Sequence, residues 1–323
     1  MTAPWITYRP ELKVLDCTVR DGGLINDHMF DDGLVKAVYD TCVAAGIDYM
    51  ELGYKASKKI FAENQFGDWK FCDEDAIRRI VGDNDSPLKL AAMADAEKTD
   101  YKEDILPKSE SVLDVIRVAT YVHQLPVAVD MIQDAHDKGY ETTCNLMAIS
   151  VAQDAEIDQA LEVLRETPAT TIVVVDSFGS LYGEQVQRLV TKYRAALEGT
   201  GKEVGIHAHN NQQLAFANTI EAIVQGANRI DATIMGMGRG AGNCPMELLI
   251  GFLRNPAYRV RPVYRLLQDY FVDLREKHEW GALVPYNITG QLNQHPRAAI
   301  GMLEGDEKYQ YLDFYDKMVN EDL

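Results

Sequence analysis

Two histidines stand one residue apart in "GIHAHNN" (205–211), inside an apolar run that is typical of a buried strand. Because successive side chains of a strand point to opposite faces, His207 and His209 should point the same way, about 7 Å apart along the strand. Two imidazoles that face one direction are suited to binding a metal ion. Two ligands do not complete a site, so other segments must supply the rest.

Three further segments carry residue types that bind metal ions or anions. "TVRDGG" contains Arg20 and Asp21, expected at the end of a strand, before two glycines that allow a sharp turn. "DYMELGY" contains Glu51, and the glycine-rich "GMGRGAGN" ends in Asn243. A carboxylate, imidazoles and an amide oxygen are suitable ligands for a divalent ion that keeps open positions.

Each segment also has a purely structural interpretation. A His-x-His pair on a strand is more often incidental than metal-binding, and Asp21 before two glycines suits a turn. The glycine-rich loop lacks both the dinucleotide-binding and the P-loop spacing. Glu51 could form a structural ion pair with Arg20. Their convergence at one end of a fold is what favours a functional site.

The elements that must position these residues alternate between short β-branched runs and amphipathic helical patterns. The strand candidates are 13–21, 48–54, 89–95, 112–120, 141–150, 171–179, 203–210 and 229–238. Eight βα units within about 250 residues predict an α/β fold, a (β/α)8 TIM barrel. A doubly wound open sheet is the alternative. We favour the barrel because the polar residues gather at the ends of the strands, which a barrel brings to one mouth.

The predicted barrel occupies residues 12–253, and residues 254–323 form a C-terminal extension packed on it. The extension is expected to begin with a helix within 255–281 and to continue as an irregular, aromatic stretch over 282–305. No Pro-, Gly- or Ser-rich linker separates it as an independent domain.

The composition excludes several classes of partner. The 323 residues carry a formal net charge of -18, which argues against nucleic acid and anionic membranes as partners. No apolar run is long enough for a membrane span, and no signal peptide is visible. The five scattered cysteines form no CxxC pair and fit a reducing cytoplasm. A homodimer is left open.

Three motifs together resemble the signature of the metal-dependent TIM-barrel carbon–carbon lyases and synthases: "LDCTVRDGG", "IHAHNN" and "GMGRGAGNCP". That superfamily includes 4-hydroxy-2-oxovalerate aldolase, hydroxymethylglutaryl-CoA lyase and the isopropylmalate synthases. The Asp-Ser pair of "VVVDSFGSLYG" and the "GAGNCP" loop are most similar to the aldolase branch.

The resemblance assigns roles to particular residues. It implies that Asp21, His207 and His209 bind a divalent metal, with Asn243 as a further ligand or close neighbour. Arg20 would hold the developing enolate oxygen, and Glu51 would hold Arg20 or a metal-bound water. The candidate substrate-binding residues are Asn145, Asp176, Ser177 and Tyr286.

One departure from the aldolase pattern concerns the general base. The aldolase has a histidine three positions after the motif aspartate, where this chain has Leu24. His28, on the loop after the first strand, is the replacement that we expect to accept the substrate's proton. Tyr54, Tyr182 and His295 are other groups within reach, as is Tyr286.

These observations predict a divalent-metal-dependent aldolase or lyase that acts on a 2-oxo acid through a pyruvate-type enolate. Mn²⁺ or Mg²⁺ is preferred, and Zn²⁺ is the next choice. A Claisen-type synthase that condenses an acyl-CoA with a 2-oxo acid is an alternative, although no basic cluster for the nucleotide is recognisable. A catalytically silent barrel used as a binding subunit is a second alternative, which Leu24 favours and the intact metal set disfavours.

Overall fold

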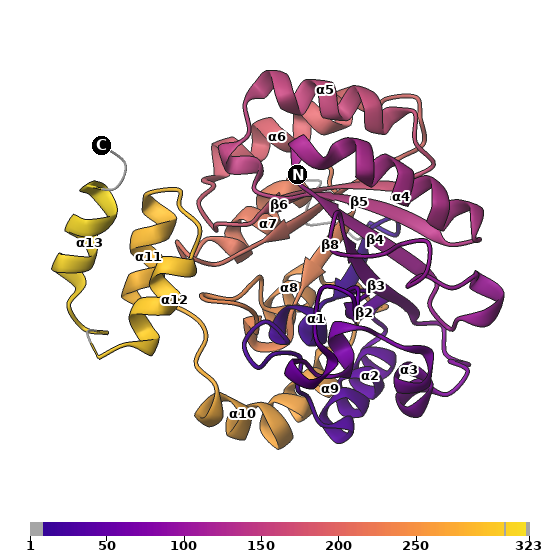
Figure 1. The fold of residues 1–323 in the computed structure, drawn as a ribbon, viewed down its shortest axis with the longest axis horizontal. Coiled ribbons are helices and arrows are strands. Elements are labelled where there is room, and N and C mark those ends of the chain that lie inside the picture. Colours follow the sequence, from indigo (N-terminus) through magenta and orange to yellow (C-terminus); the bar gives the residue numbers. More distant parts are fainter. Residues whose placement is uncertain (1–8, 307, 321–323) are drawn as a thin grey trace.

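Eight parallel strands close into a barrel in sequence order, and β8 pairs back onto β1 (Figure 1). The computed structural model describes residues 9–306 and 308–320. The strands are β1 (Lys13–Asp16), β2 (Tyr49–Tyr54), β3 (Lys89–Asp95), β4 (Val115–Thr120), β5 (Glu141–Leu146), β6 (Thr171–Asp176), β7 (Glu203–Ala208) and β8 (Arg229–Ala232). The predicted TIM barrel is therefore confirmed.

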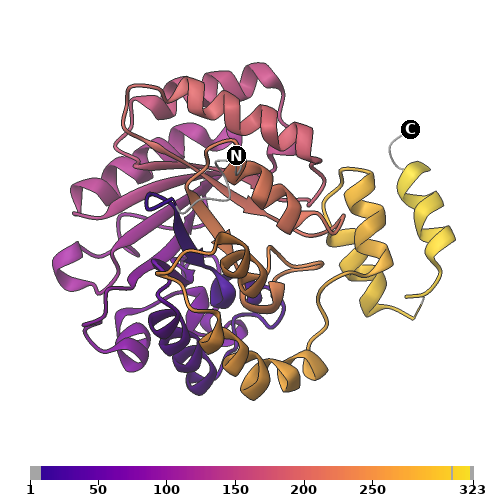
Figure 2. The same cartoon turned by 180° about the vertical axis from the view of Figure 1, so that it is seen from behind.

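A layer of helices covers the outside of the barrel, as the view from behind also shows (Figure 2). These helices are α2 (Asp32–Ala45), α3 (Glu74–Val81), α4 (Leu125–Asp137), α5 (Asp154–Arg165), α6 (Gly183–Ala196), α7 (Ala215–Val224) and α8 (Met246–Leu253). α2 illustrates why they form. The Asp31 side chain accepts from the backbone N–H of Leu34 at the start, Val35 and Val38 face the core, and Gly46 ends the helix in the left-handed conformation.

The chain leaves the first strand earlier than the sequence predicts. β1 ends at Asp16, and Thr18–Gly22 form a helical turn, α1, so Arg20 and Asp21 lie on a helix and not on a strand. The Asp16 carboxylate accepts hydrogen bonds from the backbone and the hydroxyl of Thr18 (3.1 and 2.6 Å), which favours the turn. The two glycines are not needed for a sharp turn. Gly23 instead allows close packing, because a Cβ at this position would lie 2.1 Å from Nδ1 of His28.

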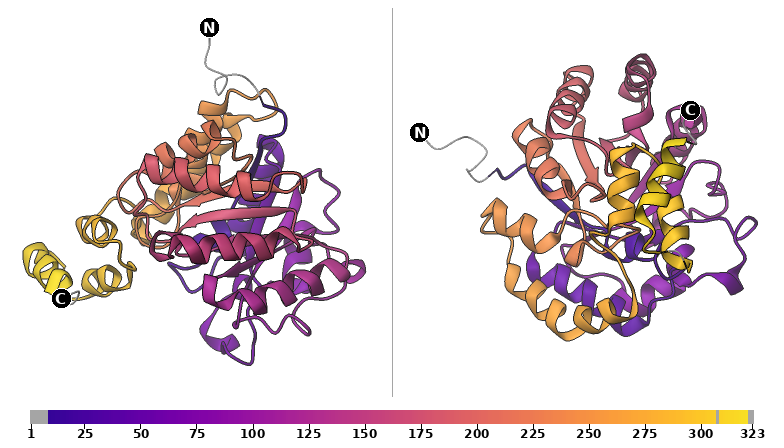
Figure 3. Two further views of the ribbon diagram at one scale, coloured as in Figure 1. Left: turned by 90° about the horizontal axis from the view of Figure 1, so that it is seen from above. Right: turned by 90° about the vertical axis from the view of Figure 1, so that its left-hand side faces the viewer.

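The C-terminal extension consists of two parts. α9 (Val260–Leu266), a π-helical turn (Leu267–Phe271) and α10 (Val272–Lys277) continue around the barrel, and α9 packs beside α2. α11 (Val284–Gln291), α12 (Arg297–Glu304) and α13 (Tyr311–Asn320) stand to one side, in yellow in Figures 1 and 3.

The expectation of an irregular stretch over 282–305 is wrong, because α11 and α12 fall within it. Proline stands at the start of each helix, a position where its missing N–H and fixed φ are tolerated: Pro285 in the first turn of α11 and Pro296 before α12. Tyr286, Phe314 and Met318 belong to the small apolar cluster that joins α11 to α13. The domain boundary at residues 253/254 stays a prediction.

α11 is attached to the loop that follows β7. Nδ2 of Asn287 donates to the carbonyl of Asn211 (2.6 Å), and Nε2 of Gln212 donates to the carbonyl of Gly290 (3.4 Å). This contact places the segment after α11, with His295, at the mouth of the barrel. Within the described part of the chain, no helix has both the length and the apolar character to cross a membrane.

Candidate active site at the barrel mouth

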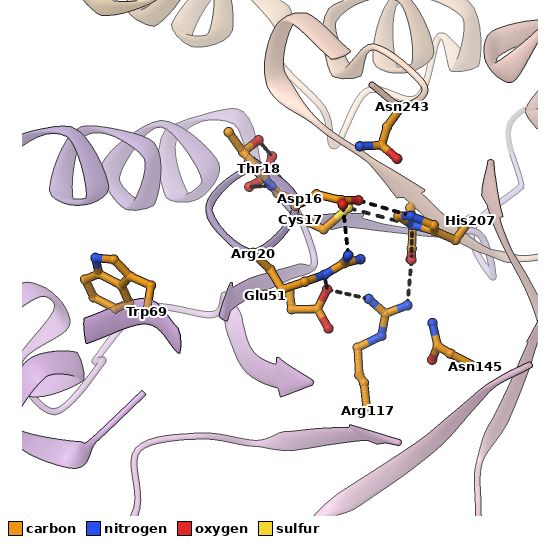
Figure 4. Close-up of polar contacts among 12 residues, drawn as sticks. Asp16, Cys17, Thr18, Arg20, Glu51, Trp69, Arg117, Asn145, His207 and Asn243 are labelled. Carbon is orange, nitrogen blue, oxygen red and sulfur yellow. Dashed lines mark hydrogen bonds and ion pairs between the residues drawn. The ribbon is translucent and has the colours of Figure 1, made fainter. Parts of the chain in front are cut away.

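Six buried charged or imidazole side chains form a closed ring of ion pairs inside the barrel: Arg20, Glu51, Arg117, Asp231, His207 and Asp21. Glu51 is the centre of one side of the ring (Figure 4). Its Oε2 accepts hydrogen bonds from Nε of Arg20 (2.8 Å) and from Nη1 of Arg117 (3.0 Å). Both guanidiniums are therefore fixed by the same carboxylate.

Asp231, His207 and Asp21 form the other side of the ring. The pairing of β7 with β8 brings His207 next to Asp231, whose Oδ2 lies 3.0 Å from Nδ1 of His207 and 2.6 Å from Nη2 of Arg117. Asp21 closes the ring. Its Oδ2 is 3.1 Å from Nε2 of His207, and its Oδ1 is 3.1 Å from Nη1 of Arg20.

The charges of this ring are unequal. Two guanidiniums face three carboxylates, so the ring carries one excess negative charge when the imidazole is neutral. Burial opposes ionisation of Asp21, but Arg20 and His207 outweigh it and hold the pKa of that carboxyl well below its usual range. Burial opposes protonation of His207, but the adjacent carboxylates of Asp21 and Asp231 outweigh it and raise its pKa. A buried site with excess negative charge suits a cation.

Several buried atoms of the ring and of the neighbouring Asn243 lack hydrogen-bond partners, which fits a bound metal ion. Both carboxylate oxygens of Asp21, Nε2 of His207 and Oδ1 of Asn243 are buried without a hydrogen bond, because the short contacts of Asp21 are poorly aligned. When Nδ1 of His207 donates to Asp231, Nε2 presents a lone pair, the arrangement typical of metal-binding histidines. An unpaired buried acceptor costs about 1–3 kcal/mol, which a bound cation would offset.

His209 lies beside this group. It is the residue after β7, its ring is centred 5.0 Å from that of His207, and its backbone pairs with Asn243. Among the described residues, the ligand atoms of Cys17, Asp21 and His207 lie within 4.8 Å of one another, and His209 is not part of this group. Burial raises the pKa of the Cys17 thiol well above its usual range, so Cys17 is a poor source of a thiolate ligand.

A cavity of about 270 Å³ opens from the ring to the surface of the barrel mouth. Six of the predicted site residues line it: Arg20, Asp21, Asn145, Ser177, His207 and His209. Leu24 lines it as well, so the position where the aldolases carry histidine does face the cavity. The Ser177 hydroxyl accepts from the backbone N–H of Ala148 (2.8 Å), which fixes its orientation.

His28 does not line the cavity, which corrects the expectation that it accepts the substrate's proton. The ring packs edge-on against Tyr54, 5.4 Å between centroids, and is 98% buried. Burial, together with Lys70 and Arg20, lowers the pKa of His28 to about 3. A group that is both shielded and weakly basic is a poor general base.

Asp176 and Tyr286 also lie away from the cavity lining, against the expectation that they bind substrate. The carboxylate oxygens of Asp176 accept from the backbone N–H groups of Ser180 (3.0 Å) and Leu181 (3.2 Å), so Asp176 shapes the loop after β6. Tyr286 packs on Gly240 within the α11 cluster.

Among the groups named as alternative bases, Tyr54 and His295 line the cavity. Burial raises the pKa of the Tyr54 hydroxyl well above its usual range. Burial and the nearby Arg239 lower the pKa of His295 to about 4, so its ring is neutral near pH 7 and, like that of His28, weakly basic. Unlike His28, it faces the cavity. His295 therefore replaces His28 as the candidate proton acceptor.

Arg117 and Asp231 are the ring members that the sequence analysis missed. Arg117 is the single charge of "VIRVAT" (115–120), and Asp231 stands within "RIDAT". A charge inside an otherwise apolar strand is the signal that would have identified both, because a buried charge needs a partner. The sequence analysis also missed Asp16, whose carboxylate accepts two hydrogen bonds from Thr18 at the start of α1.

Comparisons with known proteins identify the family of this chain. The HMGL-like family pattern matches residues 11–261. The chain belongs to the HMGL-like family. It is 31% identical to an oxaloacetate decarboxylase of Mycobacterium tuberculosis, over 75% of this chain and 69% of that protein. It is 28% identical to a 4-hydroxy-2-oxovalerate aldolase of Bacillus cereus, over 77% of this chain and 71% of that protein.

A solved structure has a similar fold over most of this chain. The N-terminal domain of a candidate aldolase from Bacteroides vulgatus superposes with a TM-score of 0.79 at 28% identity, covering 90% of this chain and 96% of that one. The predicted resemblance to the HMGL-like lyases, with the aldolase branch near, is confirmed. This member of the HMGL-like family is a carbon–carbon lyase, and its family is one of divalent-metal enzymes.

Proposed function

We propose that this protein cleaves or forms a carbon–carbon bond of a 2-oxo acid in the manner of an aldolase, through a pyruvate-type enolate. One observation carries the proposal. The unpaired acceptors of Asp21 and His207 lie next to the Arg20 guanidinium, at the bottom of a cavity of about 270 Å³. A cation site beside a fixed positive charge suits a reaction in which an oxyanion develops.

Asp21, His207 and His209 would hold the divalent ion, with Asn243 as a further candidate ligand. The ion would act as a Lewis acid on the keto group of the 2-oxo acid. Mn²⁺ or Mg²⁺ is the preferred ion, because carboxylate, amide and imidazole ligands with open positions suit both.

Arg20 supplies positive charge where the enolate oxygen develops. Its Nε binds Glu51 and its Nη1 contacts Asp21, so the planar group cannot rotate away. Arg117 in turn holds Glu51 from the other side (3.0 Å). The guanidinium is thus oriented before substrate binds, which avoids reorganisation during the reaction.

His295 would accept the proton of the substrate alcohol during cleavage. Its ring lies on the cavity wall against Phe178, 5.6 Å between centroids, and is neutral near pH 7. Replacing it by Asn should lower aldol cleavage by roughly 10²–10⁴, the contribution of a general base. Unchanged cleavage by this variant would remove His295 from the mechanism.

Decarboxylation of oxaloacetate is a second candidate, favoured by the 31% identity with the mycobacterial decarboxylase. Loss of carbon dioxide from oxaloacetate leaves the same pyruvate enolate, so the ring of ion pairs would serve both reactions. Decarboxylation needs no base for an alcohol proton. The His295→Asn variant should therefore keep decarboxylase activity if that is the natural reaction.

Hydrogen exchange at the methyl group of pyruvate tests the shared step. The protein reconstituted with Mn²⁺, and separately with Mg²⁺ or Zn²⁺, is incubated with pyruvate in D₂O and followed by NMR. We expect exchange that a chelator stops and that Arg20→Met slows by about 10²–10³. Lys102→Met, at an exposed lysine outside the cavity, is the control. Absence of exchange with every metal would refute the enolate proposal.

A further inference from the structure

Three cations line the outer part of the cavity: Lys70, Lys98 and Arg239. They come from the loops after β2, β3 and β8, so the fold gathers them from distant parts of the chain. We call them the cationic rim. A cationic rim is unexpected in a chain whose net charge is -18, where carboxylates are plentiful.

Lys70 is held by aromatic rings and not by a carboxylate. Its Nζ lies 4.2 Å from the ring centre of Phe61, 5.0 Å from Tyr54 and 5.3 Å from Phe66. Among the described residues, no carboxylate lies within ion-pair distance of it. Such a cage fixes the ammonium in place while leaving its charge available to a ligand.

Arg239 has a similar shortage of partners. Its Nε is buried without a hydrogen bond, and its Nη1 lies 3.4 Å from Nε2 of His295. No ion pair of Arg239 occurs in the part of the chain that the structure describes. Lys98 has only a long contact with Asp95 (3.4 Å).

The electrostatics of the rim favour an incoming anion. Burial and the charge of Lys98 lower the pKa of Lys70, while Asp95 and Asp27 oppose this effect. Arg239 and Lys98 likewise disfavour charge on His295. Cations that repel one another in a half-enclosed cavity attract an anion more strongly than isolated cations do.

We infer that the natural substrate carries a second anionic group, a carboxylate or a phosphate, at the end remote from its 2-oxo acid. The near end occupies the ring of ion pairs, and the far end contacts Lys70 and Arg239. Arg20, Asp21 and His207 of the ring and all three rim residues line one cavity, so one small molecule reaches both. This inference rests on the proposed function for the position of the near end.

Binding of matched 2-oxo acids by calorimetry tests the inference without a need for turnover. The Mn²⁺-loaded protein is titrated with 2-oxoadipate, which ends in a carboxylate, and with 2-oxohexanoate, which ends in a methyl group. We expect the diacid to bind about 10–100-fold more tightly, the value of one or two charge-assisted contacts. Equal affinities would overturn the inference.

Variants assign the preference to the rim. Lys70→Met and Arg239→Met keep an unbranched apolar side chain and remove the charge, and each should reduce the preference for the diacid about tenfold. Lys102→Met removes an exposed lysine that pairs with Asp134 outside the cavity, and should leave the preference unchanged. A preference that survives in both rim variants would place the anion elsewhere and refute the assignment.

The source of the anion is decided by aldehydes offered with pyruvate in the condensing direction. Succinic semialdehyde and glyceraldehyde 3-phosphate are compared with butanal and glyceraldehyde, and products are measured by mass spectrometry. A higher kcat/KM for the carboxylate or the phosphate member identifies the group, and no preference in either pair contradicts the inference. If the protein exchanges the methyl hydrogens of pyruvate but shows no such preference, this inference fails and the proposed function stands. If it exchanges none with any metal, the proposed function itself is refuted.

Discussion

The ring of ion pairs reaches the cavity through Arg20, Asp21 and His207, and the cationic rim lines the same cavity. The two are built in opposite ways. In the ring, each charged group contacts an opposite charge or the imidazole at 2.6–3.1 Å. In the rim, Lys70 and Arg239 have no carboxylate partner among the described residues, and Lys98 contacts Asp95 only at 3.4 Å. The ring residues are buried at the bottom of the cavity, while Lys98 is half-exposed.

The difference separates two tasks that an enzyme site must perform. Charges that already hold one another stay oriented as the reaction proceeds, which is what stabilisation of a developing oxyanion requires. Charges without partners gain most when a ligand arrives, which is what selection of a substrate requires. We therefore assign the chemistry to the ring and the choice of substrate to the rim.

The largest effect should follow from breaking the ring at its metal-binding side. His207→Ala removes one proposed ligand and the contact of Asp21 with the imidazole, so the protein should lose both its bound ion and its turnover. Metal analysis of the purified variant, beside circular dichroism to confirm folding, measures the outcome. A folded variant with an unchanged metal content would show that His207 is not a ligand.

Arg20→Lys should be nearly as damaging as Arg20→Ala, with turnover lower by about 10²–10³. A guanidinium contacts Glu51 and Asp21 at once, whereas an ammonium on a flexible chain cannot keep both contacts and still face the enolate. The two variants are compared by kcat at saturating substrate. Near-normal turnover of the lysine variant would reduce Arg20 to a balancing charge.

Asp231→Asn should weaken metal binding without abolishing it. Asp231 orients the His207 ring through Nδ1 (3.0 Å), and loss of such a partner typically costs about 10–100-fold in metal affinity. Titration with Mn²⁺ gives the dissociation constant, and excess metal should restore most of the turnover. If added metal restores nothing, Asp231 acts in some way other than through His207.

His28→Gln should have the smallest effect on turnover, within about a factor of ten, because His28 does not reach the cavity. A loss of roughly 10²–10⁴ would instead restore His28 as the base.

The same variant should change the dependence of stability on pH. The pKa of His28 is about 3 in the folded protein and near 6.5 in an unfolded chain. The unfolded state therefore binds the extra proton, and stability is lost as pH falls from 6.5 toward 3, by up to about 1.4 kcal/mol per pH unit. Urea midpoints of the metal-free protein at pH 7, 6 and 5 should fall less steeply in His28→Gln than in the wild type. His136→Gln, at an exposed histidine of α4, is the control.

The sequence by itself determined the barrel and identified four members of the ring of ion pairs, Arg20, Asp21, Glu51 and His207. Apolar runs of strand length alternate with helical periodicity, and this pattern is local, so it can be recognised without tertiary contacts. The predicted β3 has the observed bounds, Lys89–Asp95. His207, Asp21 and Arg20 were recognised from their residue types and spacing, because each falls near the end of a predicted strand.

Only the tertiary structure decided which charges meet. Arg117 and Asp231 lie 114 residues apart, and the order of strands around the barrel brings them to 2.6 Å. The helical turn α1 points Arg20 inward, whereas His28, on the same loop, is packed behind Tyr54. Conversely, α11 carries the distant His295 to the cavity. Burial and contact between remote segments depend on how the elements pack, and residue type and spacing do not encode them locally.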